Sequence, residues 1–364
     1  MSSENVQEGE LNEPANAGEF HPDDSGVGLS TNCRGGLSYE VASEFPREVL
    51  AFKFGGTSLL GAERMMHAAS IVHSSAQDCP VVVIVSAMKG VTDQLLAIGT
   101  ALENGKIVAA RKEAEALVEL HLGVLSELQL DEDDDLRVRR EMQSLCRDLL
   151  HDVGSQFIPL AGHDELLDRL ASYGERLSAR LFSAALEKSE VVSVPVTSSD
   201  FVRTCGTFRD ARPDLLETRE RGRAVLLPLL ADGVVPVVTG FIGATLDGRI
   251  TTLGRNSSDF SGAIVAHVVD ADELIIWTDV DGIYTANPRE NEEAQLLHEM
   301  SYDDAHALAK SGAKVLHASV LPLAAETEMV VWVRNTFNPA GRGTRIGPRA
   351  DLSTAPSSRE GGKR

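Results

Sequence analysis

Short apolar runs alternate with segments of helical spacing from residue 49 to residue 334, and this alternation limits the possible folds more than any other feature. The clearest run, VVVIVS at 81–86, is β-branched and has the length of a buried strand. Similar strands are expected at 49–54, 191–196, 234–240, 274–278 and 330–334. Helices are expected at 62–75, 91–102, 106–128, 135–150, 166–186, 258–269 and 302–311. Apolar strands separated by helices predict an α/β fold with a mostly parallel sheet covered on both faces.

The two ends of the chain do not follow this pattern. Residues 1–48 hold ten acidic and two basic residues, with scattered Gly, Ser, Asn and Pro. Such a segment buries too little apolar surface to offset the entropy that ordering costs. Residues 349–364 have a similar composition. We therefore expect one globular domain at 49–348 between two flexible tails.

The charge balance limits the classes of partner. The chain has 55 acidic and 34 basic residues, a formal net charge of -21. This excess repels phosphate backbones and anionic lipid, so neither a nucleic acid nor a membrane is expected as a partner. The sequence has no apolar run of about 18 residues, which a membrane-spanning helix needs. Four separated cysteines without a CxxC pair fit a reducing cytoplasm.

Two polar motifs directly follow predicted strands. In KFGGTS (53–58), the two glycines let backbone amides approach an anion, and Lys53 adds a positive charge. A Gly-Gly pair after a strand is also typical of a tight turn, and the spacing is not that of a Walker A loop. In SAMKGVTD (86–93), Ser86 and Thr92 offer hydroxyls to an anionic ligand, with plain helix capping as the alternative.

Two more motifs lie in or before predicted helices. YGERLSA (173–179) contains Gly174 within a helical pattern, which points to a close approach of another segment, while Glu175 could be an ordinary surface charge. TLGRNSSDFS (252–261) places Ser258 and Asp259 at the start of a helix. It also contains Arg255, whose guanidinium matches a carboxylate or phosphate. The acidic run 131–135 lacks the spacing of a calcium loop and is expected to be a helix junction.

The remaining polar motifs lie in the last third of the chain. IWTDVDGIYTANPR (276–289) ends a strand in a polar turn, where Tyr284 could stack on a base and Arg289 could bind phosphate. GAKVLH (312–317) contains Lys314, a second candidate phosphate lysine.

Taken together, these motifs resemble the catalytic domain of aspartate kinase. KFGGTS, SAMKGVTD, YGERLSA, VPVVTGF, TLGRNSSDFS, IWTDVDGIYTANPR, GAKVLH and NPAGRGT occur in that family's order, from about residue 50 to residue 347. The resemblance implies the three-layer α/β/α amino acid kinase fold. Its N-terminal part (about 49–235) would bind the amino acid, and its C-terminal part (about 236–348) would bind ATP. The implied reaction converts L-aspartate and ATP, with Mg²⁺, to 4-phospho-L-aspartate and ADP, the first step toward lysine, threonine, methionine and diaminopimelate.

The resemblance also implies a role for each matching residue. Lys53, Asp259 and Lys314 would be catalytic, with Asp259 orienting the lysines. Ser86, Thr92, Glu175, Arg255 and Ser258 would bind aspartate, with Glu175 on its ammonium and Arg255 on its α-carboxylate. ATP would be bound by Lys53, Gly55, Gly56, Thr57, Thr278, Asp279, Tyr284, Arg289, Lys314 and Val315. No metal site made by the protein alone is expected.

Some features depart from the family pattern. Ser257 stands where the family usually has a small glycine, which bears on the choice of substrate. The family's C-terminal ACT regulatory domains have no counterpart, so we expect no feedback control by lysine or threonine, unless a separate regulatory chain acts in trans. A homodimer is expected.

Three alternatives to an aspartate kinase stay open. The chain could phosphorylate an aspartate analogue in a specialised pathway, or it could be a nucleotide-binding regulatory subunit. The intact Lys53, Glu175, Arg255, Asp259 and Lys314 argue against a regulatory subunit. YGERLSA and Arg255 argue against a relative of carbamate or acetylglutamate kinases.

Overall fold

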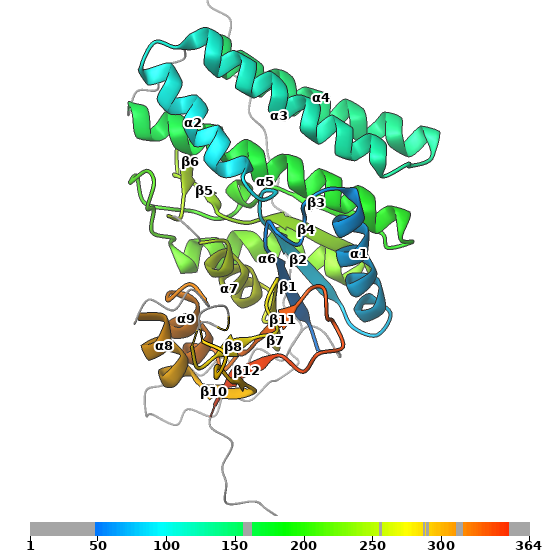
Figure 1. The fold of residues 1–364 in the computed structure, drawn as a ribbon, viewed down its shortest axis with the longest axis vertical. Helices are drawn as coiled ribbons and strands as arrows, with labels where there is room; N and C mark the ends of the chain where they lie inside the picture. Colours follow the sequence, from blue (N-terminus) through cyan, green and yellow to red (C-terminus); the bar gives the residue numbers. More distant parts are fainter. Residues whose placement is uncertain are drawn as a thin grey trace, which may run out of the picture. The chain divides into compact units, whose positions relative to one another are not determined.

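A computed structural model shows the fold of the chain (Figure 1) and describes residues 48–155, 162–254, 257–286, 288, 291–310 and 316–348. The described residues belong to one compact unit. The two predicted tails lie outside them, apart from Glu48. None of the described helices combines the length and the apolar character needed to cross a bilayer.

The centre of this unit is a large sheet. The strands in it are β1 (Leu50–Phe54), β2 (Val81–Val85), β3 (Ser193–Val196), β4 (Val235–Thr239), β7 (Glu273–Thr278), β10 (Glu299–Ser301), β11 (Val330–Asn335) and β12 (Thr344–Gly347). Their order across the sheet is β10-β12-β11-β7-β1-β2-β4-β3. Neighbouring strands are parallel, except that β11 and β12 are antiparallel. The predicted mostly parallel sheet is confirmed.

Helices cover both faces of this sheet. On one face lie α1 (Ala62–Ala76), α2 (Val91–Glu103), α3 (Ile107–Glu127), α4 (Glu132–Gly154) and α5 (His163–Lys188). On the other lie α6 (Leu215–Ala231), α7 (Ser258–Val268), α8 (Tyr302–Lys310) and α9 (Val320–Glu326). Adjacent residues of β2 serve opposite faces, since Val83 packs in the first apolar cluster and Val82 in the second. The predicted three-layer α/β/α fold is therefore confirmed.

The helices of the first face form two tiers. Helix α5 packs on β3 and β4, whereas α3 and α4 pack on α2 and α5 and on each other. In Figure 1, α3 and α4 accordingly lie farther from the sheet than α5 does. The long α5 is therefore buried between the sheet and this helical pair over most of its length.

Several elements differ from the sequence-based expectation. Helix α4 begins at Glu132 rather than at 135, so the acidic run forms its first turn, where negative charge is favourable. Asp131 precedes the helix without a side-chain capping bond. The unpredicted elements are α6, α9, β10, β12, a 3₁₀ turn at Ser198–Asp200, the antiparallel pair β5 (Ile242–Ala244) and β6 (Ile250–Thr252), and the pair β8 (Ile283–Tyr284) and β9 (Leu296–Leu297).

The strand order brings four loops to one edge of the sheet. Beyond β1, the Gly55 amide donates to the Trp277 carbonyl of β7 at 3.2 Å. The Ser86 amide, just after β2, donates to the Phe54 carbonyl at 3.2 Å. The Gly240 amide, after β4, donates to the Val85 carbonyl at 2.8 Å. The carboxyl ends of β1, β2, β4 and β7 thus meet, and this is the edge where open α/β sheets bind ligands.

Candidate active site

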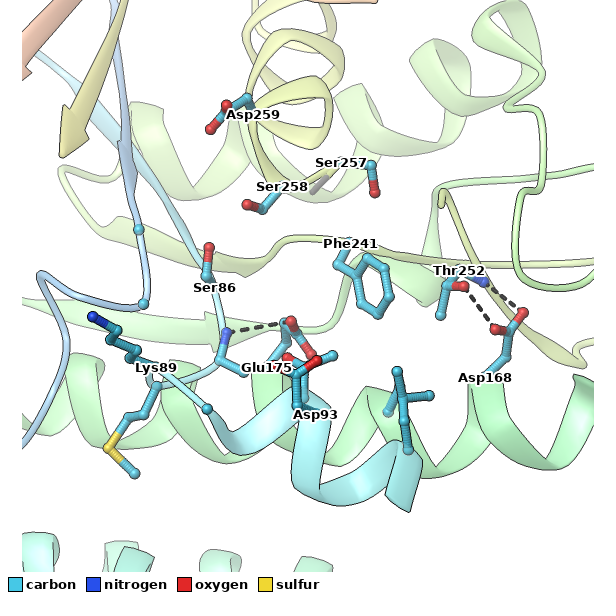
Figure 2. A pocket seen from close by; sticks show the side chains of 18 of the residues that line it. Ser86, Lys89, Asp93, Asp168, Glu175, Phe241, Thr252, Ser257, Ser258 and Asp259 are labelled. Carbon is cyan, nitrogen blue, oxygen red and sulfur yellow. Dashed lines mark hydrogen bonds between the residues drawn. The ribbon is translucent and has the colours of Figure 1, made fainter. Parts of the chain in front are cut away.

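A cavity of about 460 Å³ lies at this edge of the sheet (Figure 2). Its wall contains residues from β1, the loop after β2, α2, α5 and the start of α7. Among the residues singled out in the sequence, it brings together Lys53, Gly55, Gly56, Ser86, Thr92, Glu175, Ser258 and Asp259. Motifs that are more than 200 residues apart in the chain therefore share one site.

Lys53 and Asp259 form an ion pair in this cavity. The Lys53 Nζ lies 2.6 Å from Asp259 Oδ1, and the two side chains are only 8% and 17% exposed. Lys53 comes from the centre of the sheet, and Asp259 from the first turn of α7. Because β1 and α7 are both well packed, this contact holds the lysine ammonium at a fixed place on the cavity wall.

The loop after β1 is packed tightly against the loop after β2. The Lys89 amide donates to the Gly56 carbonyl at 3.1 Å. A Cβ added to Gly56 would lie 2.5 Å from the Ala87 carbonyl oxygen, so no larger residue fits there without movement. The Gly55 amide, expected to face an anion, instead donates to Trp277 in the neighbouring strand. The glycines were expected to let the backbone approach an anion. In the structure they let the loop after β1 approach β7 and the loop after β2.

Glu175 is the buried carboxylate of the cavity. It lies on α5 and is 3% exposed, and its Oε1 accepts a hydrogen bond from the Ala87 amide at 3.3 Å. Its Oε2 is buried and has no hydrogen-bond partner among the described residues. Burial raises the pKa of Glu175 to about 8, although the Ala87 amide opposes that shift. A cationic group of a ligand would supply the partner that Oε2 lacks.

Gly174 explains how Glu175 reaches this place. A Cβ on Gly174 would lie 2.8 Å from the Ala87 Cβ and 3.2 Å from Val91, so α5 touches the start of α2 directly. The close approach predicted from a glycine within a helix is confirmed. It brings the α5 backbone, and with it Glu175, against the loop after β2.

Hydroxyl groups line the rest of the cavity. Thr92 is in the first turn of α2, and Ser258 begins α7. The buried hydroxyls of Ser86 and Ser257 have no hydrogen-bond partner among the described residues. Ser257 is fully buried and contributes to the cavity wall, so the serine that departs from the family pattern does face the site. These groups can hydrogen-bond to the oxygens of an anionic ligand.

Asp168, Arg209 and Phe241 also line the cavity, and none of them was singled out as a site residue from the sequence. Asp168 is fully buried and accepts hydrogen bonds from the amides of Arg209 and Thr252 and from the Thr252 hydroxyl. It lies seven residues before Glu175, two helical turns along the same face of α5, and that spacing could have revealed it. Burial raises the pKa of Asp168, while these hydrogen bonds oppose the shift.

Arg209 and Phe241 are alike in their backbone conformation. Their φ angles are 71° and 67°, a region that residues other than glycine seldom adopt. Figure 2 shows the Phe241 ring between Glu175 and Ser257, with Asp168 toward one end of the cavity and Lys89 toward the other. The sequence signal that could have revealed Phe241 is its position directly after Gly240 and the apolar run of β4.

The other predicted site residues are not on this wall. Thr278 ends β7, next to β1, and Asp279 follows it as an exposed residue. Tyr284 is in β8, and Thr57, beyond Gly56, accepts a hydrogen bond from Arg64 through its carbonyl at 2.8 Å. Arg255, Arg289, Lys314 and Val315 lie outside the described residues. The role assigned to each of these residues stays a prediction.

The combined features limit what this cavity can bind. A buried carboxylate with an unpartnered oxygen suits an ammonium group, and the hydroxyls and Lys53 suit oxygen anions. A zwitterionic amino acid offers both kinds of group on one small molecule.

The comparison with protein families agrees with this site. The model of the amino acid kinase family matches residues 48–335, which include every described residue of the cavity. The chain belongs to the amino acid kinase family. Within that family it is 33% identical over 299 residues to lysine-sensitive aspartokinase 3 of Escherichia coli, covering 82% of this chain and 64% of the relative. It is also 31% identical over 312 residues to the aspartokinase of Chlamydia trachomatis, covering 84% of this chain and 66% of that one.

Solved structures of amino acid kinases lead to the same grouping. The E. coli aspartokinase III structure in complex with aspartate and ADP has a TM-score of 0.75 and 32% identity, and the match covers 84% of this chain and 66% of that one. Carbamate kinase from Giardia lamblia, at a TM-score of 0.53 and 13% identity, shares the fold alone. The chain thus spans 64–66% of the length of these E. coli and C. trachomatis aspartokinases.

Proposed function

We propose that this chain transfers the γ-phosphoryl group of ATP to the β-carboxylate of L-aspartate, forming 4-phospho-L-aspartate. The observation that carries the proposal is the unpartnered, buried Oε2 of Glu175 in the same cavity as the Lys53–Asp259 pair. Glu175 would bind the substrate ammonium, while Ser86, Thr92 and Ser258 would bind its carboxylate oxygens. The likeness to a structure that holds aspartate and ADP supports this choice of ligands.

The proposed acceptor needs no general base. A β-carboxylate with an ordinary pKa near 3.9 is ionised at neutral pH and is itself the nucleophile. One of its oxygens attacks the γ-phosphorus, and the bond from that phosphorus to the β–γ bridging oxygen breaks. ADP leaves with the electron pair. The obstacle is repulsion between two anions, so the protein contributes mainly position and positive charge.

ATP would bind across the loops after β1 and β7, with Lys53 and Lys314 near its phosphates. Thr278, Asp279, Tyr284, Arg289 and Val315 would hold the rest of the nucleotide. Mg²⁺ would enter with ATP. Asp279 is an exposed carboxylate directly after β7, and Mg²⁺ commonly binds one or two carboxylates together with phosphate oxygens and water. When bound, Mg²⁺ would neutralise part of the phosphate charge.

The product would feed the synthesis of lysine, threonine, methionine and diaminopimelate in the cytoplasm. We also propose that residues 49–235 form the amino-acid-binding part and residues 236–348 the ATP-binding part. The Lys53–Asp259 contact, which crosses that boundary, then lies where the two substrates meet. The expected homodimer is tested by light scattering of the purified chain.

The decisive experiment identifies the acceptor. ADP release is measured in a coupled assay with aspartate, glutamate or acetylglutamate, with and without Mg²⁺. Hydroxylamine is added in parallel, because it converts an acyl phosphate into a stable hydroxamate. Aspartate-dependent ADP release with an equal amount of hydroxamate is the expected result. Release without hydroxamate, or with glutamate or acetylglutamate preferred, would contradict the proposal.

A further inference from the structure

Lys89 is an exposed lysine on the wall of the cavity. It directly follows Met88 in the loop between β2 and α2, two residues before α2 begins at Val91. Figure 2 shows its side chain at the same end of the cavity as Ser86, away from Asp168 and Thr252. No ion pair to this lysine occurs among the residues that the structure describes. It is therefore a cation that is not neutralised by a neighbouring carboxylate there.

The backbone of Lys89 is fixed beside the loop that follows β1. Its amide donates to the Gly56 carbonyl at 3.1 Å, and a Cβ on Gly56 would lie 3.3 Å from the Lys89 Cα. The side chain thus starts in contact with the glycine loop, at Gly56. Its four-carbon stem is flexible, so the ammonium can move over that loop once an anion is present.

Lys53, the other described lysine of the cavity, cannot balance all the negative charge of the reacting groups. Lys53 is held by Asp259 at 2.6 Å, so this pair contributes little net positive charge. The transferred group carries negative charge on its equatorial oxygens and meets an anionic acceptor. Lys89, which has no carboxylate partner among the described residues, supplies the net positive charge that the Lys53–Asp259 pair lacks.

We propose that the Lys89 ammonium binds the γ-phosphoryl group of ATP and stays on it during transfer to the acceptor. This inference rests on the proposed use of ATP, but it does not depend on which carboxylate is the acceptor. No proton is transferred to or from Lys89. It donates hydrogen bonds to the γ-phosphoryl oxygens, and the only bonds exchanged are those to phosphorus.

The test compares nucleotides that differ in the γ-phosphate. The variants are Lys89→Ala, Lys89→Arg and, as a matched control, Lys112→Ala on the exposed face of α3. Calorimetry with Mg²⁺ measures the dissociation constants of ATP and ADP without an acceptor. The coupled assay measures kcat and the KM for ATP and for aspartate. Thermal unfolding shows that each variant is folded.

Loss of a charge-assisted hydrogen bond should weaken ATP binding, or lower kcat/KM for ATP, on the order of tenfold or more in Lys89→Ala. ADP affinity should stay within about twofold of the wild type, since ADP lacks the γ-phosphate. Lys89→Arg should recover most of the loss, and Lys112→Ala should match the wild type.

Three results would overturn the inference. The first is equal behaviour of Lys89→Ala and Lys112→Ala toward ATP. The second is an equal loss of ATP and ADP affinity, which would place Lys89 on other phosphates or give it a structural role. The third is a rise in the KM for aspartate alone, which would place it on the acceptor. If the wild type binds ATP as described but does not phosphorylate aspartate, the proposed function fails while this inference stands.

Discussion

Glu175 on α5 and Ala87 after β2 are joined by a single hydrogen bond, from the Ala87 amide to Oε1 at 3.3 Å. This bond fixes the orientation of the carboxylate and leaves Oε2 without a partner among the described residues. Asp93, on α2, lines the same cavity. Since burial raises the pKa of Glu175 to about 8, the carboxyl is mostly neutral at pH 7 in the absence of ligand.

Aspartate binding should therefore strengthen as the pH rises. The substrate ammonium needs the ionised form of Glu175, so affinity should increase by up to about tenfold per pH unit between pH 6 and 8 and then level off. Calorimetry at pH 6, 7, 8 and 8.5, in two buffers of different ionisation enthalpy, also shows whether a proton is released. Glu175→Gln should remove this pH dependence and weaken aspartate binding far more than ATP binding. A Glu175→Gln variant with the pH profile of the wild type would contradict the assignment.

The same carboxyl should make the protein less stable as the pH rises. The native state keeps the Glu175 proton up to a pKa of about 8, whereas the unfolded chain releases it near the usual value of 4.5. Between these two values the native state binds more protons, so this group lowers the free energy of unfolding as the pH rises. Compared with the wild type, Glu175→Gln should gain stability from pH 6 to pH 8. Urea unfolding at both pH values measures the difference.

The Lys53–Asp259 pair allows stability and catalysis to be separated. Lys53→Met should abolish phosphoryl transfer, and it should also lower the free energy of unfolding by about 3 kcal/mol, because it leaves a mostly buried carboxylate unpaired. The double variant Lys53→Met/Asp259→Asn should recover much of that stability without recovering activity. Urea unfolding and the ADP-release assay measure the two effects. Activity near the wild-type level in either variant would show that Lys53 is structural only.

Gly56 and Gly123 should respond oppositely to the same substitution. Gly56→Ala forces a Cβ to within 2.5 Å of the Ala87 carbonyl oxygen, so the loops after β1 and β2 must move apart and transfer should be lost. Gly123 is exposed within α3, and its Cβ would meet nothing within 4 Å. Gly123→Ala should therefore stabilise the protein by up to about 1 kcal/mol and leave activity unchanged. Thermal unfolding and initial rates compare the two variants, and full activity in Gly56→Ala would disprove the close packing of these loops.

Asp168 should hold the backbone of Arg209 and Thr252 in place on the cavity wall. Asp168→Ala leaves the Thr252 and Arg209 amides without their acceptor, which should cost about 1–3 kcal/mol of stability. It should also raise the KM for aspartate more than it lowers kcat, because the strand that leads to the 255–258 segment loses its anchor on α5. Glu113→Ala, at an exposed position of α3, is the control and should change stability by less than about 0.5 kcal/mol. If the two variants behave alike, Asp168 has no special role.

Much of the fold could be predicted because its central strands are apolar on both faces. The strands β1, β2, β4 and β7 lie within one residue of the predicted ranges. The strands β5, β6, β8 and β9 have only two or three residues, too few for a periodic pattern. Helix α6 was missed because Pro228 lies inside it and its charged residues hide an apolar face.

The site was predictable where its residues occur in motifs and not where tertiary contacts create it. Lys53, Glu175 and Ser258 each stand in a distinctive local sequence. Asp168 is an acidic residue in an ordinary helical pattern, and it becomes a site residue only because α5 crosses β6. Arg209, which has an unusual φ angle, is likewise held by a hydrogen bond from its amide to Asp168, 41 residues away in the chain.

The central position of β1 also determines when the site can form during synthesis. Leu50–Phe54 pairs with β7 over more than 200 residues, and the glycine loop is held by the Trp277 carbonyl on that side. A growing chain emerges from the ribosome with β1 first, so its partner on one side is missing until most of the chain has been translated. Strand pairings between residues so far apart in the sequence form late, and they make folding slower. The nascent chain therefore carries an exposed edge at β1 for most of translation, and the part of the cavity formed by the loop after β1 is among the last to be completed.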